Sequence, residues 1–172
     1  MDMVIKGRRA LVFGGSRGMG RATAQCLANE GVLVTIAARN PDTLRQAAAE
    51  ITTATGVPVA PVVADITSEA GRAAAIVACP NPDILINNAD GPKPGDFRHL
   101  DRDQWIAALD SMMLGPIAMM RAVVDGMIER KFGRIIHQLA LGEVAAGRNA
   151  LVEQRAPGAG GVRGRSVAPD RA

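Results

Sequence analysis

The amino-acid sequence predicts a doubly wound α/β fold, in which a parallel sheet is covered by helices on both faces. Three observations predict this fold. Short apolar runs alternate with segments of helical periodicity from residue 11 to residue 139. A glycine-rich turn follows the first apolar run, and two prolines interrupt the third. We therefore expect one domain over residues 1–141, with the strand order 3-2-1-4-5.

The first strand leads directly into the glycine-rich turn, in the stretch LVFGGSRGMGRA at residues 11–22. Its glycines are Gly14, Gly18 and Gly20. Glycine tolerates a positive φ and has no Cβ, so a negatively charged pyrophosphate can approach the backbone. The N–H groups and the positive dipole end of the following helix favour such an anion. The turn therefore predicts a dinucleotide phosphate site.

The second strand is predicted at residues 32–37, a β-branched run that follows Gly31. Asn40 is a suitable N-cap and Pro41 a suitable first residue for the next helix, which we expect to end at Gly56. The residues expected on its buried face follow helical spacing and are Leu44, Ala47, Ala48 and Ile51.

The third strand is predicted at residues 57–64, where Pro58 and Pro61 interrupt an apolar run. Because proline cannot donate a backbone hydrogen bond, such a strand belongs at the edge of a sheet. The third strand is the edge in the order 3-2-1-4-5, so the prolines and the topology agree.

Further elements are expected as a helix at 68–78, a strand at 83–87 and a strand at 134–139. Between the last two, Asp101 and Gln104 have the spacing of a capping box, which predicts the start of a long helix through Arg130. Pro116 lies inside this helix and is expected to kink it, because proline removes one backbone hydrogen bond.

The regular pattern stops near Ala140. Residues 142–172 contain six Gly, five Arg and two Pro, and no Ile, Met, Phe or Trp. Such a segment buries too little apolar surface to order itself, so we expect a disordered tail. Residues 1–141 carry 15 basic and 14 acidic side chains, and the basic excess lies mainly in this tail. No basic stripe is interleaved with aromatic residues, so nucleic acid is not the expected partner.

A membrane-spanning protein is not expected, since no apolar stretch approaches the ~20 residues of a membrane span. The first residues, MDMVIKGRRA, lack the apolar region of a secretion signal, so a cytoplasmic location is expected. Cys26 and Cys79 have no metal-ligand spacing, and we expect both to be buried free thiols.

Several motifs in this order resemble the short-chain dehydrogenase/reductase family, from about residue 6 to residue 137. They are the GxxxGxG turn, Arg39, Asp65-Ile66, Asn87-Asn88-Ala89, Trp105 and the stretch GRII at residues 133–136. The resemblance implies a Rossmann-like fold and an oxidoreductase that moves hydride between a nicotinamide dinucleotide and a small carbonyl or alcohol substrate. It also implies a homo-oligomer.

The resemblance further implies the roles of individual residues in cofactor binding. Residues on the phosphate and ribose side would be Ser16, Arg17 and Met19, beside Gly14, Gly18 and Gly20. Asp65 and Ile66 would contact the adenine, and Asn88 and Ala89 would lie beside the ribose near the nicotinamide. Two asparagines at a strand end also commonly satisfy the backbone of a turn. Asp90 replaces the glycine that the family usually has, and an acid there would weaken binding.

The residue after the second strand distinguishes the two nicotinamide cofactors. NAD sites place a carboxylate there for the ribose 2′-hydroxyl, whereas the 2′-phosphate of NADP needs cations. This chain has Ala38 and Arg39 at that place, and Arg17 in the glycine turn. The cofactor is therefore expected to be NADP rather than NAD, although either arginine could be an ordinary surface charge.

The catalytic residues of the family are not found in this chain. It contains no tyrosine, Met112 occupies the position of the family's asparagine, and Ala140 occupies that of its serine. The lysines, Lys6, Lys93 and Lys131, all precede the position of the family's lysine. His137 lies near the right strand end, but a lone histidine in an apolar strand is more often structural.

A frameshift is the first explanation for these missing residues. Reverse translation of residues 139–155 with GC-rich codons, read one nucleotide later, gives SRSVKSPPVGMPWLSN. This peptide resembles the family's continuation and restores a serine. We therefore expect a C-terminally truncated or frameshifted member, in which the fifth strand is an exposed edge and the family's oligomer is doubtful. The alternative is a non-catalytic nucleotide-binding remnant or interaction module.

Overall fold

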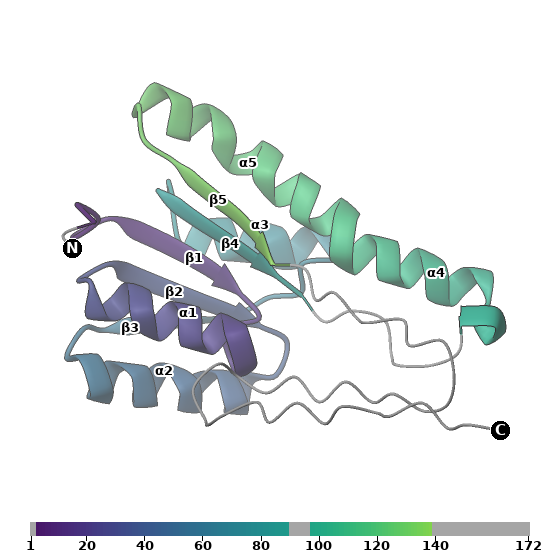
Figure 1. The fold of residues 1–172 in the computed structure, drawn as a ribbon, viewed down its shortest axis with the longest axis horizontal. Helices are drawn as coiled ribbons and strands as arrows, with labels where there is room; N and C mark the ends of the chain where they lie inside the picture. The colour runs from purple at the N-terminus through teal and green to yellow at the C-terminus, as the bar shows by residue number, and fades with distance from the viewer. Residues whose placement is uncertain (1–2, 90–96, 139–172) are drawn as a thin grey trace, which may run out of the picture.

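The computed structural model describes residues 3–89 and 97–138, which form a five-stranded parallel sheet with helices on both faces (Figure 1). The strand order is β3-β2-β1-β4-β5, which confirms the predicted order and the Rossmann-like fold. The strands are β1 (Arg9–Phe13), β2 (Leu33–Ala38), β3 (Val59–Val63), β4 (Ile84–Asn88) and β5 (Arg134–Gln138).

Because the strands are parallel and in register, their carboxyl ends all lie at the same end of the sheet. Leu11 in the central strand β1 is paired with Thr35 on one side and Leu85 on the other. At the outer side of β2, Pro61 of β3 lies opposite Ile36, and β3 has no further neighbour among the described strands. The prediction that the proline-containing strand lies at an edge is therefore confirmed.

Two pairs of helices cover the two faces of the sheet (Figure 1). Helices α1 (Gly18–Asn29) and α2 (Pro41–Thr55) pack on one face, where Leu44 and Ile51 are fully buried. Helices α3 (Glu69–Ala78) and α5 (Gly115–Glu129) pack on the other face. The two resulting cores share only the sheet, as a doubly wound fold requires.

The ends of the helices agree with the capping residues expected from the sequence. The side chain of Asn40 accepts hydrogen bonds from the backbone N–H groups of Asp42 and Thr43, both at 3.0 Å. Gly56 ends α2 in the left-handed conformation, with φ +71°. Ser68 caps α3 by accepting from the N–H of Gly71 at 3.0 Å. These caps fix where each connection from strand to helix ends.

A long helical segment joins β4 to β5. After a short 3-10 turn, η1 (Phe97–His99), it consists of α4 (Arg102–Leu109), the π-helical segment η2 (Asp110–Leu114) and α5. The capping box is confirmed, with hydrogen bonds of 2.8 and 2.9 Å between Asp101 and Gln104. Pro116 lies in the first turn of α5, and the irregularity expected there takes the form of the π-helical segment directly before it. A wider turn accommodates a residue that has no N–H to donate.

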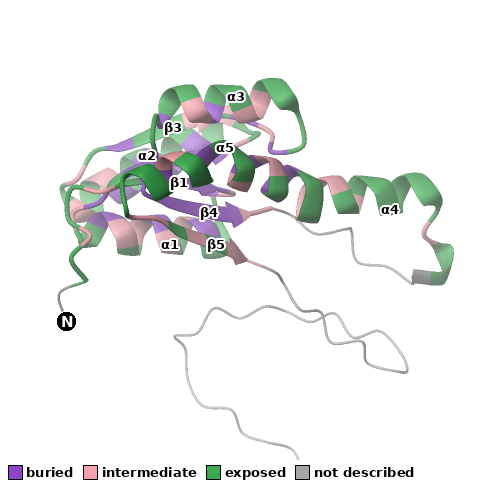
Figure 2. Cartoon of the chain, turned by 90° about the horizontal axis from the view of Figure 1, so that it is seen from above, coloured by how far each residue is buried: buried purple, intermediate pink, exposed green. Residues whose placement is uncertain are grey.

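The α4 part of this helix projects from the body of the molecule (Figure 2). It has no buried residue, whereas α5 buries Met119, Val123 and Met127 against the sheet. Residues 102–129 are long and apolar enough to count as a membrane-span candidate, with a mean hydropathy of 1.4 over the best window. The expectation that no apolar stretch approaches this length is therefore wrong. The candidate is weak, because core helices of soluble proteins satisfy the same criterion.

The two cysteines differ in burial. Cys79 is buried as expected, and burial raises the pKa of its thiol. Cys26 is exposed on α1, so the prediction of burial is wrong for this residue. Ala24 and Ala28 lie on the buried face of α1. Cys26 is two residues from each of them, so its side chain lies on a different face of the helix.

Some expectations from the sequence lie outside the described residues. They are the disordered tail at 142–172, Ala140 at the family's serine position, Asp90 after the asparagines, and the last residue of the predicted fifth strand, Leu139.

Candidate functional site

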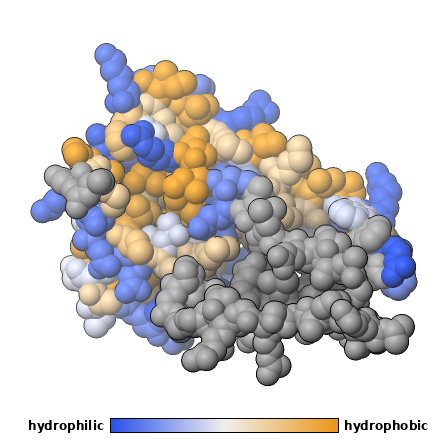
Figure 3. Space-filling model, in the orientation of Figure 1, coloured by the Kyte–Doolittle hydropathy of each residue, from blue (hydrophilic) through white to orange (hydrophobic). Residues whose placement is uncertain are grey.

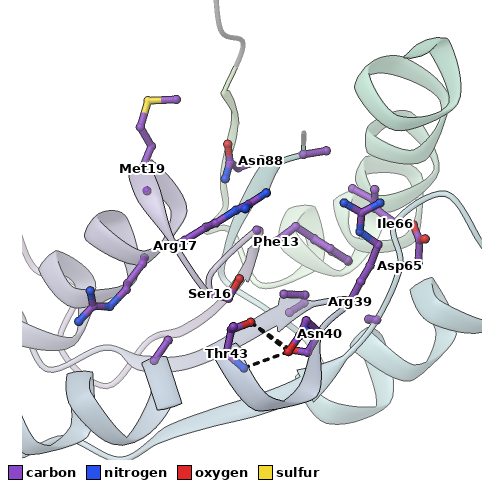
Figure 4. Close-up of a pocket in the computed structure, with 18 of the residues that line it drawn as sticks. Phe13, Ser16, Arg17, Met19, Arg39, Asn40, Thr43, Asp65, Ile66 and Asn88 are labelled. Atoms are coloured by element: carbon purple, nitrogen blue, oxygen red, sulfur yellow. Dashed lines mark hydrogen bonds between the residues drawn. The ribbon is translucent and has the colours of Figure 1, made fainter. Parts of the chain in front are cut away.

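A pocket of about 870 Å³ opens at the carboxyl ends of the strands (Figure 4). Its walls come from the segments that follow β1, β2, β3 and β4, together with the last residue of β5. Of the cofactor-binding residues predicted from the sequence, the structure places these on the pocket wall: Gly14, Ser16, Arg17, Gly18, Met19, Arg39, Asp65, Ile66, Asn88 and Ala89. The remaining one, Gly20, is not on the wall but packs against Gly14 and Asn88.

The three glycines of the turn have different physical roles. A Cβ at Gly14 would lie 2.5 Å from the side-chain nitrogen of Asn88, and a Cβ at Gly20 would overlap the carbonyl oxygen of Gly14. These two glycines therefore allow β1, α1 and the end of β4 to pack closely. Gly18 has a φ of +55° and open space around its missing Cβ. It permits the left-handed turn and leaves the approach to the backbone clear.

The N-terminus of α1 faces the same pocket. Arg17 occupies the N-cap position with extended backbone and makes no side-chain capping hydrogen bond. The first N–H groups of α1 therefore have no side-chain acceptor from the N-cap residue, which is the usual condition for anion binding at a helix start. Ser16 lies beside them in Figure 4, and the side chain of Arg17 extends into the pocket.

The end of β2 supplies the second arginine. Arg39 follows Ala38, and Figure 4 shows its side chain directed towards Asp65 and Ile66. Asn40 and Thr43 lie below it and are held by the capping hydrogen bonds of α2. The two guanidinium groups of Arg17 and Arg39 therefore line one pocket from two different loops.

Asp65 is kept as a carboxylate by its surroundings. Burial raises its pKa, but hydrogen bonds from the backbone and hydroxyl of Thr67 and the charge of Arg39 outweigh burial, and the pKa is lowered overall. The two bonds from Thr67 measure 2.9 and 2.8 Å to the same oxygen, Oδ1. This side of the pocket thus contains a fixed acceptor next to the buried side chain of Ile66.

The adjacent asparagines at the end of β4 point in opposite directions. Asn88 lines the pocket and contacts the glycine turn. Asn87 is fully buried on the other face and donates to the carbonyl of Pro116 at 3.4 Å. Asn87 therefore contacts the start of α5 on the other face of the sheet, whereas Asn88 belongs to the pocket.

The sequence-based interpretation missed part of the pocket wall. On α1 and α2 these residues are Arg21, Thr43, Gln46 and Glu50. Thr43, Gln46 and Glu50 follow the i, i+3, i+7 spacing of one helix face, so the periodicity of α2 contained a usable signal. Arg21 and Glu50 form an ion pair of 2.7 Å that ties α1 to α2 beside the pocket.

Ser111 and Gln138 were also missed. Each is adjacent in the sequence to a residue that the sequence analysis examined, Met112 and His137. Counting from Trp105 points to Met112, but Ser111 lies on the pocket wall instead. His137 is not on the wall, whereas the next residue, Gln138, is. The described residues contain no group of three or more His, Cys, Asp or Glu side chains that could hold a metal ion.

The pocket thus combines an anion-binding turn with Arg17 at the central strand, Arg39 and a fixed carboxylate on the β2–β3 side, and amide side chains on the β4–β5 side. This arrangement suits an elongated, phosphorylated ligand that crosses the sheet edge where the strand order reverses between β1 and β4. The residues present fit a dinucleotide, because the turn at Gly18 leaves the backbone open to phosphates and two arginines line the same pocket.

Comparisons with known proteins agree with this geometry. Residues 8–141 match the family model described as short chain dehydrogenase. An uncharacterized oxidoreductase of Bacillus subtilis is 31% identical over 137 residues, which cover 79% of this chain and 52% of that protein. The acetoacetyl-CoA reductase of Shinella zoogloeoides is 36% identical over 135 residues, which cover 76% and 54%.

Solved structures give the same result. L-sorbose reductase from Gluconobacter frateurii, complexed with NADPH and L-sorbose, superposes with a TM-score of 0.74 at 31% identity, covering 80% of this chain and 54% of that one. A metagenomic short-chain oxidoreductase in complex with NADP has a TM-score of 0.69 at 30% identity, covering 76% and 61%. The chain therefore spans about half the length of the curated relatives that it matches.

Proposed function

This chain belongs to the short-chain dehydrogenase family, and we propose that it is the cofactor-binding part of an NADP-dependent oxidoreductase that moves hydride between NADPH and a small carbonyl or alcohol substrate. The observation that carries the choice of cofactor is the position of Arg39 and Arg17 in one pocket. No acid occupies the end of β2, where a carboxylate would select the free 2′-hydroxyl of NAD.

The names of the relatives support the same proposal. Two of the similar structures, L-sorbose reductase and the metagenomic oxidoreductase, are complexes with NADPH and NADP. The acetoacetyl-CoA reductase and a 3-oxoacyl-[acyl-carrier-protein] reductase of Vibrio harveyi are named for reducing oxo groups. We infer the class of reaction from these names, and the identity of the substrate stays open.

The proposed roles follow the position of each residue in the pocket. The glycine turn and Ser16 would bind the pyrophosphate, with Met19 beside them. Arg17 and Arg39 would bind the 2′-phosphate, since a guanidinium group suits a phosphate geometrically and keeps its charge. The adenine would lie against Asp65 and Ile66, and the second ribose beside Asn88 and Ala89. NADPH, when bound, supplies the hydride.

Direct titration of the purified chain with NADPH and NADH tests this proposal. We expect NADPH to bind at least tenfold more tightly, because each charge-assisted contact with a phosphate is worth about 1.5–3 kcal/mol. Equal affinity for the two cofactors would overturn the choice of NADP. Absence of binding by both would overturn the proposal as a whole.

A second candidate function is nucleotide binding without turnover. The observation that favours it is the absence of tyrosine from the 172 residues, together with Met112 at the family's asparagine position. An assay of NADPH oxidation with a panel of aldehydes and ketones separates the two candidates. Binding without oxidation of NADPH supports the second, whereas turnover that falls with Arg39→Ala at limiting NADPH supports the first.

A further inference from the structure

Gln138 lies on the opposite side of the pocket from Arg39, because it ends β5 whereas Arg39 follows β2. It is the last residue of β5, and the register pairs it with Asn88 of β4. Because side chains alternate along a strand, Gln138 and Asn88 are on the α1 side of the sheet, whereas His137 faces the opposite side. The side chain of Gln138 confirms this direction, since it donates to the hydroxyl of Thr23 on α1 at 3.4 Å.

The two polar atoms of the Gln138 side chain differ in their hydrogen bonding. The nitrogen, Nε2, is used in the bond to Thr23. The oxygen, Oε1, is shielded from solvent and accepts no hydrogen bond from any residue in the described part of the chain. A buried acceptor without a donor is costly in free energy and rare in native proteins. Gln138 lines the pocket, so a molecule bound there would supply the donor once the side-chain amide turns this oxygen towards it.

The half of a dinucleotide that reaches Gln138 follows from the topology. A dinucleotide crosses the sheet edge at the point where the strand order reverses, and each nucleotide lies over one half of the sheet. Arg39 and Asp65 follow β2 and β3, so the nucleotide with the 2′-phosphate belongs over that half. Asn88 and Gln138 end β4 and β5, so the nicotinamide nucleotide belongs over them.

We propose that Gln138 is a cofactor-positioning residue whose Oε1 atom accepts a hydrogen bond from the nicotinamide nucleoside half of bound NADP(H). This inference rests on the proposed function. The bond to Thr23 holds the amide nitrogen on the α1 side of the pocket, which leaves the oxygen as the atom that can accept from the cofactor. Gln138 thereby positions the nicotinamide half of the cofactor, whereas Arg17 and Arg39 bind its 2′-phosphate.

The test compares two ligands that differ in this half alone. NADPH contains the nicotinamide nucleoside, whereas 2′,5′-ADP carries both adenosine phosphates and lacks it. In Gln138→Leu, which keeps the size of the side chain, we expect NADPH to bind about tenfold more weakly and 2′,5′-ADP to bind within twofold of the unchanged chain. Thr23→Val should give a smaller loss of the same kind, because it removes only the orienting bond.

The matched control is His137→Leu. His137 is the neighbouring residue of β5, and its side chain lies on the opposite face of the sheet. We expect it to leave the affinities for both ligands within twofold. If His137→Leu gives the same selective loss as Gln138→Leu, the effect belongs to the strand and the proposal is wrong. Equal weakening of both ligands by Gln138→Leu, or no weakening, also overturns it.

A second measurement uses the unchanged chain, so it does not depend on whether a variant folds. The side-chain amide of Gln138 gives an NMR signal in the unchanged chain, which should shift on addition of NADPH and stay in place with 2′,5′-ADP. An identical response to the two ligands would contradict the proposal while leaving the proposed function intact. Failure of the chain to bind 2′,5′-ADP and NADPH would instead reject the proposed function, and the role of Gln138 with it.

Discussion

The helices around the pocket and the helix that follows β4 bury their apolar side chains to very different extents. In α2, Leu44 and Ile51 are fully buried against the sheet. In α4 no residue is buried, and Trp105 and Leu109 remain 47% and 44% exposed. Figure 3 shows apolar side chains at the surface over α4 and α5. The same chain therefore contains one region with a closed core and one with apolar surface left uncovered.

The difference in burial indicates which packing stabilises the pocket. The glycine turn, α1, α2 and the first three strands pack on one another, and most of the pocket wall belongs to them. The region of α4 and β5 contributes Ser111 and Gln138 to the wall, yet Ile136 of β5 is 49% exposed. We infer that the end of the pocket that carries the arginines is stabilised from within, and that the other end depends on weaker packing.

A leucine-to-alanine substitution should change the free energy of unfolding very differently in the two regions, and its effect in the closed core should be the largest of all. Leu44→Ala should lower the free energy of unfolding by about 2–5 kcal/mol, because it leaves a cavity in a closed core. Leu109→Ala should lower it by less than about 0.5 kcal/mol, because the side chain is half exposed and the site can fill with water. Urea denaturation of the two variants measures both values, and similar losses would remove the contrast between the regions.

Removing the arginine at the end of β2 should have the next largest effect. Arg39→Ala is expected to weaken NADPH about tenfold or more, which corresponds to about 1.4 kcal/mol, and to leave NADH nearly unchanged. Arg121→Ala serves as the control, since Arg121 is an exposed arginine on α5 that does not line the pocket. Calorimetric titration checks both variants. Equal loss of the two cofactors in Arg39→Ala would show that Arg39 does not read the 2′-phosphate.

Helix caps offer a smaller and more local comparison. Asn40→Ala removes the cap of α2 and should lower global stability by about 1 kcal/mol, because α2 is part of the closed core. Asp101→Ala removes the capping box of α4 and should mainly speed hydrogen exchange in α4 itself. Hydrogen exchange and thermal melting together distinguish the two outcomes. A global loss from Asp101→Ala comparable with that from Asn40→Ala would mean that α4 is part of the cooperative core.

The smallest expected effect concerns the carboxylate at the pocket. The pKa of Asp65 is lowered in the folded chain, so its ionised form stabilises the fold above the unfolded value of about 3.8, and this stabilisation is lost as the pH falls through the folded pKa. The stability of Asp65→Asn should therefore lie below that of the unchanged chain at pH 7 and converge with it in acid. A constant difference across the pH range would assign the loss to something other than ionisation.

The sequence predicted the fold well because its signals were local. Glycines at a strand end, prolines in one strand and the capping box at Asp101 each have a physical cause within a few residues. The strand order then followed from the alternation of strands and helices and from the edge position of Pro61. Cys26 shows the limit of this reasoning, since helix membership alone did not say which face it occupies.

The site was harder to predict where its residues depend on tertiary geometry. Pro116 signals a lost hydrogen bond, but the sequence does not say that the helix widens over Asp110–Leu114. The count from Trp105 gave Met112 as the family's asparagine position, but it did not show that Ser111, in the same segment, lies on the pocket wall. Gln138 was missed because its importance depends on Thr23, which lies on a helix far away in the sequence.

The hydrogen bond between Gln138 and Thr23 joins residues that are 115 positions apart in the chain. The ion pair between Arg21 and Glu50 beside the glycine turn joins residues 29 positions apart, so it closes a shorter loop and can form earlier in folding. The Gln138 contact closes a far longer loop and loses more chain entropy before it is made. We therefore expect the pocket to be assembled from the arginine end first, with the docking of β5 as the late event that completes it. An early folding intermediate would recognise a phosphate before it could orient a nicotinamide.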